Sequence, residues 1–312
     1  MTNTLEDRSL AERLKLRIER EKEFARTGRK LRNKSWLFRY EKIWMRPLVK
    51  FGLQACGLYG RGVKNALRPV IRHLRLTFDN LPSAFEGYTL LHISDFHIDG
   101  IPDLVAPLGK LLRDLTPDLC VFTGDYRFDD EGTCKHIYPL MRKVFSDISA
   151  SDGVLGILGN HDAAEIAFVL DEMGIRMLIN DAVEIRRENQ SIWVIGIDDP
   201  FDYKCDDLPG ALQTVPASAF KVLLAHTPEL YEPAAQRGVN LYLSGHTHAG
   251  QIRFPIVGSI RNNADCPSEY AYGHWQYKKM HGYTSAGVGC SALPIRFSCP
   301  PEITLIRLSS QS

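Results

Sequence analysis

From residue 88 onward, short apolar runs alternate with stretches in which apolar residues recur every three or four positions. The runs predict β-strands at 90–94, 119–123, 154–158, 192–196, 221–225, 241–244 and 303–308. The periodic stretches predict helices at 104–115, 135–149, 163–173 and 228–237. Strands that alternate with helices indicate an α/β fold with the helices outside the sheets. Because the sequence has no internal repeat and no long linker, residues 82–310 are expected to form one domain.

Residues able to bind metal ions follow the ends of five of these predicted strands. They are Asp95 with His97, Asp125, Asn160 with His161 and Asp162, His226, and His246 with His248. In α/β folds, ligands bind beyond the carboxyl ends of strands, so the five loops are expected to converge. Imidazole nitrogens together with carboxylate and amide oxygens suit manganese, iron or zinc rather than a thiolate cage. The sequence therefore predicts a metal site where the strands end.

The composition excludes several other classes of protein. With 44% hydrophobic and 24% charged residues, the chain is typical of a folded globular protein and not of a disordered one. No apolar run approaches the roughly 18 residues that a membrane-spanning helix needs, and Met1 does not lead into a secretory signal. The seven cysteines are scattered without a CxxC pair, which predicts reduced thiols, no zinc finger and a cytoplasmic location.

Charge divides the chain into a basic N-terminal segment and an acidic remainder. Residues 1–76 contain 20 Lys and Arg against seven Asp and Glu, a net charge of +13, whereas the other 236 residues carry −12. We expect an exposed helix at 10–34. From Trp36 to Phe51, apolar residues recur at helical spacing opposite a basic stripe, and Pro47 is expected to kink or divide this helix.

Two interpretations of residues 36–75 remain open. An amphipathic helix with tryptophans opposite basic residues fits the surface of an anionic membrane, which would make the protein peripheral on the inner face of that membrane. The alternative is that the amphipathic helix packs on the protein's own domain. Binding to nucleic acid is not expected, because the sequence contains no recognised nucleic-acid module.

The five metal-capable motifs together resemble the signature blocks of the calcineurin-like metallophosphoesterases. The blocks are Asp95-x-His97, Gly124-Asp125, Gly159-Asn160-His161-Asp162, His226 and Gly245-His246-Thr247-His248, in that family's order. The resemblance covers most of residues 88–250 and implies a four-layer αββα sandwich, here with a basic helical extension at 1–76. The ending at 293–302 is similar to a bacterial branch of stand-alone phosphodiesterases that includes UDP-2,3-diacylglucosamine hydrolase-like enzymes.

The resemblance also implies a role for each motif residue. The first of two divalent metal ions would be held by Asp95, His97 and His248. The second would be held by Asn160, His226 and His246, with Asp125 bridging both ions. Mn²⁺ is the metal we expect, with iron or zinc as alternatives. His161 resembles the catalytic histidine that protonates the leaving oxygen, and Asp162 either orients that ring or caps the following helix.

Two features leave alternatives open. Arg127 stands where relatives often carry aliphatic or small residues, so it would either clamp a substrate phosphate or form a surface ion pair with Asp129 or Asp130. The segment 262–277, rich in aromatic and polar residues, would either face the substrate or form a lid that only packs.

These motifs predict a phosphoric-ester hydrolase in which hydroxide held between two metal ions attacks phosphorus in line. A phosphodiester or pyrophosphate is the expected substrate, and a lipid-linked one such as UDP-2,3-diacylglucosamine would follow from membrane binding. The alternative enzyme is a soluble phosphodiesterase that acts on nucleotides. An alternative of another class is a catalytically silent binding scaffold, against which the intact set of ligands argues.

Overall fold

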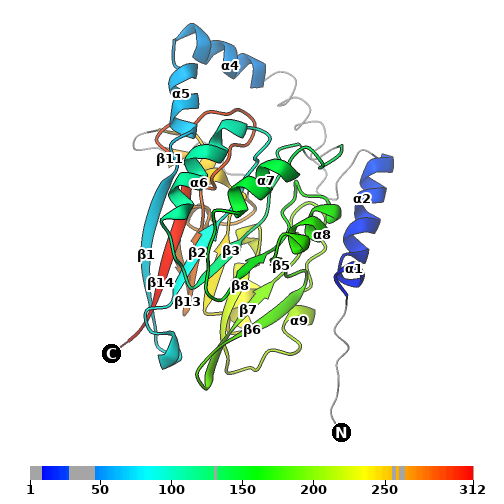
Figure 1. Ribbon diagram of the computed structural model, residues 1–312, viewed down its shortest axis with the longest axis vertical. Helices are drawn as coiled ribbons and strands as arrows, with labels where there is room; N and C mark the ends of the chain where they lie inside the picture. Colours follow the sequence, from blue (N-terminus) through cyan, green and yellow to red (C-terminus); the bar gives the residue numbers. More distant parts are fainter. Residues whose placement is uncertain (1–8, 28–45, 130–131, 255–257, 260–263, 312) are drawn as a thin grey trace.

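The computed structural model describes residues 9–27, 46–129, 132–254, 258–259 and 264–311. Its main body consists of two six-stranded β-sheets packed face to face, with helices on the two outer surfaces (Figure 1). The expected four-layer αββα sandwich is confirmed.

The first sheet combines five strands from residues 70–177 with one strand from residues 302–310. It contains β1 (Val70–Phe78), β2 (Thr89–Ile93), β3 (Leu119–Phe122), β4 (Val154–Gly156), β5 (Ile175–Met177) and β14 (Glu302–Ser310). The strand order is β1-β14-β2-β3-β4-β5. Strands β2 to β5 are parallel, β14 is antiparallel to β2, and β1 is parallel to β14. The carboxyl ends of β2, β3 and β4 therefore lie at one edge.

The second sheet supplies the other motif loops. It contains β6 (Asp181–Arg187), β7 (Gln190–Gly196), β8 (Phe220–Leu224), β9 (Leu241–Ser244), β12 (Gly273–Tyr277) and β13 (Met280–Thr284). The order is β12-β13-β9-β8-β7-β6, with a parallel centre from β13 to β7 and an antiparallel strand at each edge. Two short strands, β10 (Arg253–Phe254) and β11 (Gly258–Ser259), form a separate antiparallel pair.

The helices form where apolar residues share one face. They are α1 (Leu10–Arg13), α2 (Lys15–Thr27), α4 (Arg46–Ala55), α5 (Tyr59–Ala66), α6 (Val105–Arg113), α7 (Tyr138–Phe145), α8 (Ala164–Glu172), α9 (Leu208–Ala211) and α10 (Tyr231–Gln236). In α6, for example, Val105, Leu108 and Leu112 are buried on one face. Helix α1 begins at a capping box in which Ser9 and Glu12 each bond the other's backbone N–H.

Alternating side chains along the strands divide the core into layers. Leu90 faces the second sheet, whereas the next residue, Leu91, faces the helices α6, α7 and α8. On the outer surface of the second sheet, α9 and α10 pack with Trp275 in a third apolar cluster. The helices thus cover the faces of the sheets, and the site is left to the loops at the strand ends.

All seven predicted strands are present, and each of the four predicted helical stretches contains an observed helix. Five strands of the two main sheets were not predicted from apolar runs, namely β1, β5, β6, β12 and β13, and neither was the short pair β10 and β11. The expected exposed helix at 10–34 is present in part, because residues 10–27 form α1 and α2 and most of their side chains are exposed, but one face is not. Leu14 and Arg17 of this segment are fully buried, because α1 and α2 pack on the domain instead of extending into solvent.

The rest of the basic N-terminal segment is described in part. Trp36 and the other apolar residues before Arg46 lie outside the described residues. Helix α4 contains Pro47 in its first turn and continues past Gly52 to Ala55. Residues 70–76 belong to β1, so the change of charge near position 76 falls inside a strand of the first sheet.

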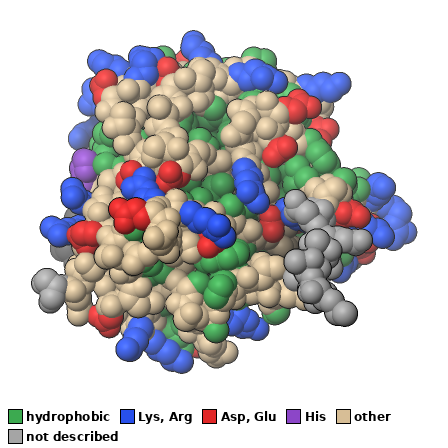
Figure 2. Space-filling view, turned by 60° about the horizontal axis from the view of Figure 1, so that its bottom comes forward, with side chains coloured by type: hydrophobic (Ala, Val, Ile, Leu, Met, Phe, Trp, Pro, Cys, Tyr) green, Lys and Arg blue, Asp and Glu red, His purple; other side chains and the backbone are tan. Residues whose placement is uncertain are grey.

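Among the described residues, no helix is long and apolar enough to cross a membrane. The face shown in Figure 2 carries Lys and Arg side chains interspersed with Asp and Glu. The separation of charge along the sequence is therefore not repeated as a single-sign surface on this face.

Candidate metal centre

The five motif loops meet at the carboxyl ends of the parallel strands of both sheets. Within each sheet, main-chain hydrogen bonds join neighbouring loops, as from Asp95 N to the carbonyl of Gly124 (3.0 Å) and from Gly245 N to that of His226 (2.9 Å). Between the sheets, the backbone N–H of His246 donates to both carboxylate oxygens of Asp95, at 3.0 Å each. The expected convergence of the loops is thus present.

The backbone of this region is unusual. The left-handed φ angles among the predicted ligands are those of Asp95 (53°), His97 (38°), Asp125 (58°), His246 (69°) and His248 (49°). A non-glycine residue in this conformation costs of order 1 kcal/mol or more, and such residues cluster at functional sites. Glycines provide the space that these loops need, because a side-chain carbon on Gly159 or Gly245 would overlap the neighbouring aspartate carboxylate.

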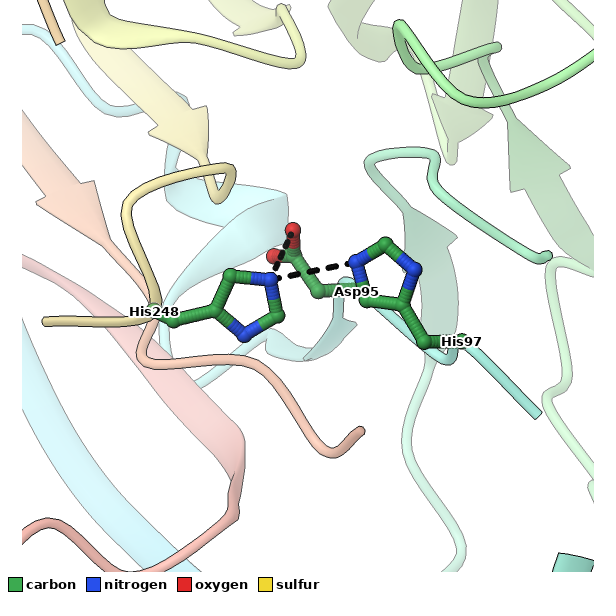
Figure 3. A group of neighbouring side chains, drawn as sticks. All are labelled: Asp95, His97 and His248. Carbon is green, nitrogen blue, oxygen red and sulfur yellow. Dashed lines mark hydrogen bonds and ion pairs between the residues drawn. The ribbon is translucent and has the colours of Figure 1, made fainter. Parts of the chain in front are cut away.

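Asp95, His97 and His248 form one group, which we call the first half-site (Figure 3). Nε2 of His248 lies 3.1 Å from Nε2 of His97 and 3.5 Å from Oδ1 of Asp95. Because imidazole nitrogens bind metal ions at about 2.0–2.1 Å, donors roughly 3 Å apart can share one cation. All three side chains are buried. The first half-site is therefore shaped to surround a small positive ion.

Asp125, Asn160, His226 and His246 form a second group, the second half-site. Nε2 of His226 lies 3.0 Å from Oδ1 of Asn160 and 3.2 Å from Nδ1 of His246. Asp125 also faces the first half-site, since its Oδ2 is 3.4 Å from Nε2 of His97 and 3.3 Å from Nε2 of His226. One carboxylate thus lies between the two groups.

Main-chain carbonyls fix the orientation of two of the imidazole rings. Nδ1 of His97 lies 2.8 Å from the carbonyl oxygen of Arg127, and Nδ1 of His226 lies 2.7 Å from that of Thr123. A carbonyl oxygen only accepts hydrogen bonds, so each Nδ1 carries a proton, and in the neutral ring the lone pair of Nε2 points into the site. Metal-binding histidines are held in this way.

The charges in the site favour a cation. Burial by itself lowers the pKa of His226, but the Asp125 carboxylate raises that pKa to about 10. Burial pushes the pKa of Asp125 upward, yet His226 and the other imidazoles hold it well below its usual range. Burial, with His97 and Arg296 nearby, lowers the pKa of His248 well below its usual range, which keeps that ring neutral. Metal binding requires ionised carboxylates and neutral imidazoles, so Asp125 and His248 are already in the required states, whereas His226 releases a proton when an ion binds.

His161 lies beside the two half-sites. Its backbone N–H donates to Oδ1 of Asp125 (2.9 Å), and its Nδ1 lies 2.6 Å from the carbonyl oxygen of Phe128, to which it donates. The ring stands nearly perpendicular to that of His97, with 4.9 Å between the centroids. Nε2 is therefore the nitrogen through which His161 would exchange a proton with a substrate.

Asp162 is fully buried and binds backbone groups. Its carboxylate accepts N–H groups from Asp125 and Tyr126, at 2.8 Å each, and from Gly159 at 2.7 Å. The N-cap of α8 is Ala163, which makes no side-chain capping bond, so Asp162 is not the cap. The carboxylate instead joins the two loops that follow β3 and β4.

Arg127 and the segment 262–277 also have structural contacts. The Arg127 side chain is buried, and it donates from Nε to the carbonyl of His161 (2.5 Å) and from Nη1 to that of Gly132 (3.1 Å). Arg127 therefore does not lie on the surface, as the ion-pair alternative assumed, and Asp130, one of the two partners named for that pair, lies outside the described residues. In the described residues 264–277, Tyr270 and Trp275 pack in the outer apolar cluster, which is the packing alternative.

Sequence analysis missed Asp202, which supports the second half-site. Its Oδ2 accepts a hydrogen bond from Nδ2 of Asn160 (3.0 Å), which fixes the amide so that Oδ1 faces His226. A signal was available, because Asp198 and Asp199 stand within three residues of the end of the predicted strand at 192–196, as several motif residues do after theirs.

A second missed residue, Arg296, lies beneath the first half-site and is fully buried. Its Nη2 donates to the carbonyl oxygens of Gly289 (2.6 Å) and Ala286 (2.7 Å), and lies 3.4 Å from Nδ1 of His248. No strand-end pattern marks this arginine. Its role depends on the path of the loop between β13 and β14.

Comparison with known families identifies the fold and the chemistry. The model of the family described as calcineurin-like phosphoesterase matches residues 88–250, which is more than half of the chain. The chain belongs to this family. As a calcineurin-like phosphoesterase with two clusters of metal-binding side chains, it is a metal-dependent phosphoester hydrolase with a binuclear divalent-metal site.

Curated relatives cover most of this phosphoesterase. The uncharacterized metallophosphoesterase YkuE of Bacillus subtilis is 32% identical over 74% of this chain and 82% of its own length. Phosphodiesterase YaeI of Escherichia coli is 28% identical over 77% of this chain and 87% of its own length. Among solved structures, phosphopantetheinyl hydrolase from Mycobacterium tuberculosis aligns with a TM-score of 0.43 at 12% identity, covering 65% of this chain and 91% of that one.

Proposed function

We propose that each half-site holds one divalent metal ion and that Asp125 bridges the two ions. The observation that carries the proposal is the position of Oδ2 of Asp125, 3.4 Å from Nε2 of His97 and 3.3 Å from Nε2 of His226. A shared carboxylate offsets the mutual repulsion of two cations at the roughly 3.5–4 Å separation of two-metal sites. The mixture of imidazole, carboxylate and amide donors suits Mn²⁺ first, with iron or zinc as alternatives.

The residues around the ions have separate roles in the proposed reaction. When bound, the ions lower the pKa of an attacking water and stabilise charge on the phosphoryl oxygens. His161 then supplies a proton from Nε2 to the leaving oxygen, as a general acid. Its hydrogen bonds to Asp125 and to the carbonyl of Phe128 hold the ring toward the site, while Asp162 keeps the two loops together.

The proposed substrate class is a phosphodiester or a pyrophosphate. The relationship to a protein named as a phosphodiesterase supports this choice over a protein phosphate. The test is hydrolysis of bis(p-nitrophenyl) phosphate by the full-length chain with added Mn²⁺, with a chelator as the control. We expect turnover that the chelator abolishes. A fully metallated protein without turnover on diesters and pyrophosphates would instead identify a catalytically silent scaffold.

A second proposal is that α4 binds the surface of an anionic membrane at its inner face. Helices α4 and α5 project beyond the sheets at one end of the molecule (Figure 1). Leu48 and Phe51 are 64% and 69% exposed, and Val49 is exposed beside them. The neighbouring Lys50 is also exposed, so apolar and basic side chains lie together on one short helix. This combination suits an interface of acyl chains and anionic head groups.

Co-sedimentation with phosphatidylglycerol-containing vesicles tests the membrane proposal. We expect that Leu48→Ser with Phe51→Ser reduces binding, because the two side chains supply the apolar contact. Phe168→Ser is the matched control, since Phe168 is 38% exposed on α8, away from α4. Point variants are preferable to deletion of residues 1–76, which would remove most of β1 from the first sheet. Equal binding by the double variant and the wild type would contradict the proposal.

Membrane binding would favour a lipid-linked substrate such as UDP-2,3-diacylglucosamine. The sequence ending at 293–302, similar to that branch of phosphodiesterases, supports this choice. The test compares hydrolysis of UDP-2,3-diacylglucosamine in vesicles with that of soluble nucleotide pyrophosphates. We expect the lipid-linked substrate to have the higher kcat/KM. A preference for the soluble compounds would favour the alternative, a phosphodiesterase that acts on nucleotides.

A further inference from the structure

Helix α2 inserts one arginine into the interior of the catalytic domain. Arg17 is fully buried, although it belongs to a highly charged helix at the N-terminal end of the chain. Its Nη2 donates to the carbonyl oxygens of Gly159 (2.8 Å) and Asp162 (2.6 Å). Its Nη1 donates to Oδ1 of Asp198 (2.7 Å), and its guanidinium carbon lies 3.8 Å from the ring centre of Tyr203.

The two carbonyls that Arg17 binds lie on either side of Asn160 and His161. One guanidinium nitrogen therefore holds both ends of the short loop that carries a proposed metal ligand and the proposed acid. A guanidinium carries its donors on separate nitrogens, so Nη2 binds this loop while Nη1 binds a carboxylate, whereas a lysine would have to reach all these acceptors from one nitrogen. The contacts define the backbone of the loop and leave its side chains directed toward the site.

The same arginine links this loop to the one that follows β7. Asp199 accepts backbone N–H groups from Phe201, Asp202 and Tyr203, which gives that loop a fixed shape. Asp202 in turn accepts from the amide of Asn160. Asn160 is thus held through its backbone from the side of α2 and through its amide from the side of β7.

Stability alone is a weak reason for such a contact. A buried ion pair loses much of its attraction to desolvation, and well-packed apolar residues often serve the fold as well or better. Arg17 and Asp198 are both at most 1% exposed, so this cost applies in full. The choice of arginine is explained by the two carbonyls, which need donors at one defined place.

We propose that Arg17 is a positioning residue for the second half-site, through which helix α2 sets the loop of Asn160 and His161. The proposal rests on the assignment of Asn160 as a ligand of the second metal ion. It extends the metal centre to a segment far outside residues 88–250, the region that the family model matches.

The test measures the stepwise affinity of the metal-free full-length protein for Mn²⁺ in Arg17→Met. We expect the second ion to bind about 10- to 100-fold more weakly, the usual effect of losing a residue that orients a ligand, while the affinity for the first ion stays unchanged. Electron paramagnetic resonance should then show isolated Mn²⁺ ions at a stoichiometry where the wild type shows a coupled pair. Arg26→Met is the matched control, because Arg26 is exposed on the same helix.

A second variant separates positioning from folding. Arg17→Met with Asp198→Asn removes both buried charges, so we expect it to recover the melting temperature that Arg17→Met loses, but not the affinity for the second ion. Recovery of both quantities in the double variant, or unchanged affinity in Arg17→Met, would overturn the proposal. Asn160→Ala is measured in parallel. If Asn160→Ala keeps both ions at full affinity, the ligand assignment itself fails, whereas loss in Asn160→Ala without loss in Arg17→Met rejects only the role of Arg17.

Discussion

The two half-sites differ in how their ligands are held. In the first half-site, Asp95 receives the N–H of His246, and Arg296 lies against the ring of His248, so the support comes from loops at the ends of neighbouring strands. In the second, the amide of Asn160 is held by Asp202, and the backbone on either side of Asn160 is held by Arg17 of a distant helix. Arg17 and Arg296 both lie outside residues 88–250. A motif region can therefore contain every proposed ligand and still lack groups that position them.

Asp125→Ala would test whether the half-sites depend on each other. If Asp125 is shared, its loss should weaken the binding of both ions. It should also remove about 4 kcal/mol of transition-state stabilisation, or ~10³-fold in rate. Metal content of the purified variant and kcat/KM on bis(p-nitrophenyl) phosphate provide the measurement. Asp129→Ala, at an exposed position of the same loop, is the control. Full occupancy of either half-site in Asp125→Ala would show that the two are independent.

His161→Gln should affect neither half-site. We expect two bound ions and a fall in kcat of about 10²- to 10⁴-fold on a diester with an alkyl leaving group, because the general acid is lost. The fall should be much smaller with p-nitrophenolate as the leaving group, which needs no proton. The measurements are kcat of His161→Gln and of the wild type on the two kinds of diester, and the metal content of both proteins. Equal losses on both substrates would assign His161 to charge stabilisation and not to proton transfer.

Asp202→Ala should lower the affinity for a metal ion at the second half-site only. The amide of Asn160 loses its partner and is free to rotate, so we expect roughly 10- to 100-fold lower affinity for one of two Mn²⁺ ions. Asp202→Asn keeps an oxygen that can accept the same hydrogen bond and should lose less. Calorimetric titration of both metal-free variants with Mn²⁺ measures the two affinities. An equal loss for both ions would contradict the separation of the half-sites.

A smaller effect concerns His92, a buried histidine outside both half-sites. Burial lowers its pKa from 6.5 to about 3, so between these values the unfolded chain binds a proton that the folded protein does not. Stability should therefore fall as the pH drops below 6.5, by at most about 1.4 kcal/mol per pH unit from this group. Melting temperatures of the metal-free protein from pH 7 to pH 4 test this. His92→Gln should flatten the profile, whereas His136→Gln, at an exposed position, should leave it unchanged.

The fold was predictable where strands are buried on both faces. The missed strands β1, β5, β6 and β12 are the four edges of the two main sheets, and edge strands carry polar side chains that break up apolar runs. In strand β1, the exposed Arg72 and Arg75 interrupt the apolar residues. Apolar runs therefore predicted most interior strands and missed the edges of both sheets, together with the interior strand β13.

The proposed ligands were predictable for a related reason. Each one follows a buried strand within a few residues, so its position depends on local sequence and on the common edge of parallel strands. Arg17 and Asp202 depend on long-range contacts, since Arg17 meets its carbonyl partners more than 140 positions along the chain. Nothing in the neighbouring sequence distinguishes Arg17 from the other basic residues of α2.

Strand β14 has a consequence for how this enzyme is made. It lies between β1 and β2, and Val70 is paired with Glu302 near the end of the chain. Because β14 separates β1 from β2, this sheet is not continuous until residues 302–310 have been synthesised. Contacts this distant slow folding and lengthen the exposure of unpaired strands. Loss of β14 alone would leave a gap between β1 and β2, whereas loss of an edge strand would only make the sheet narrower.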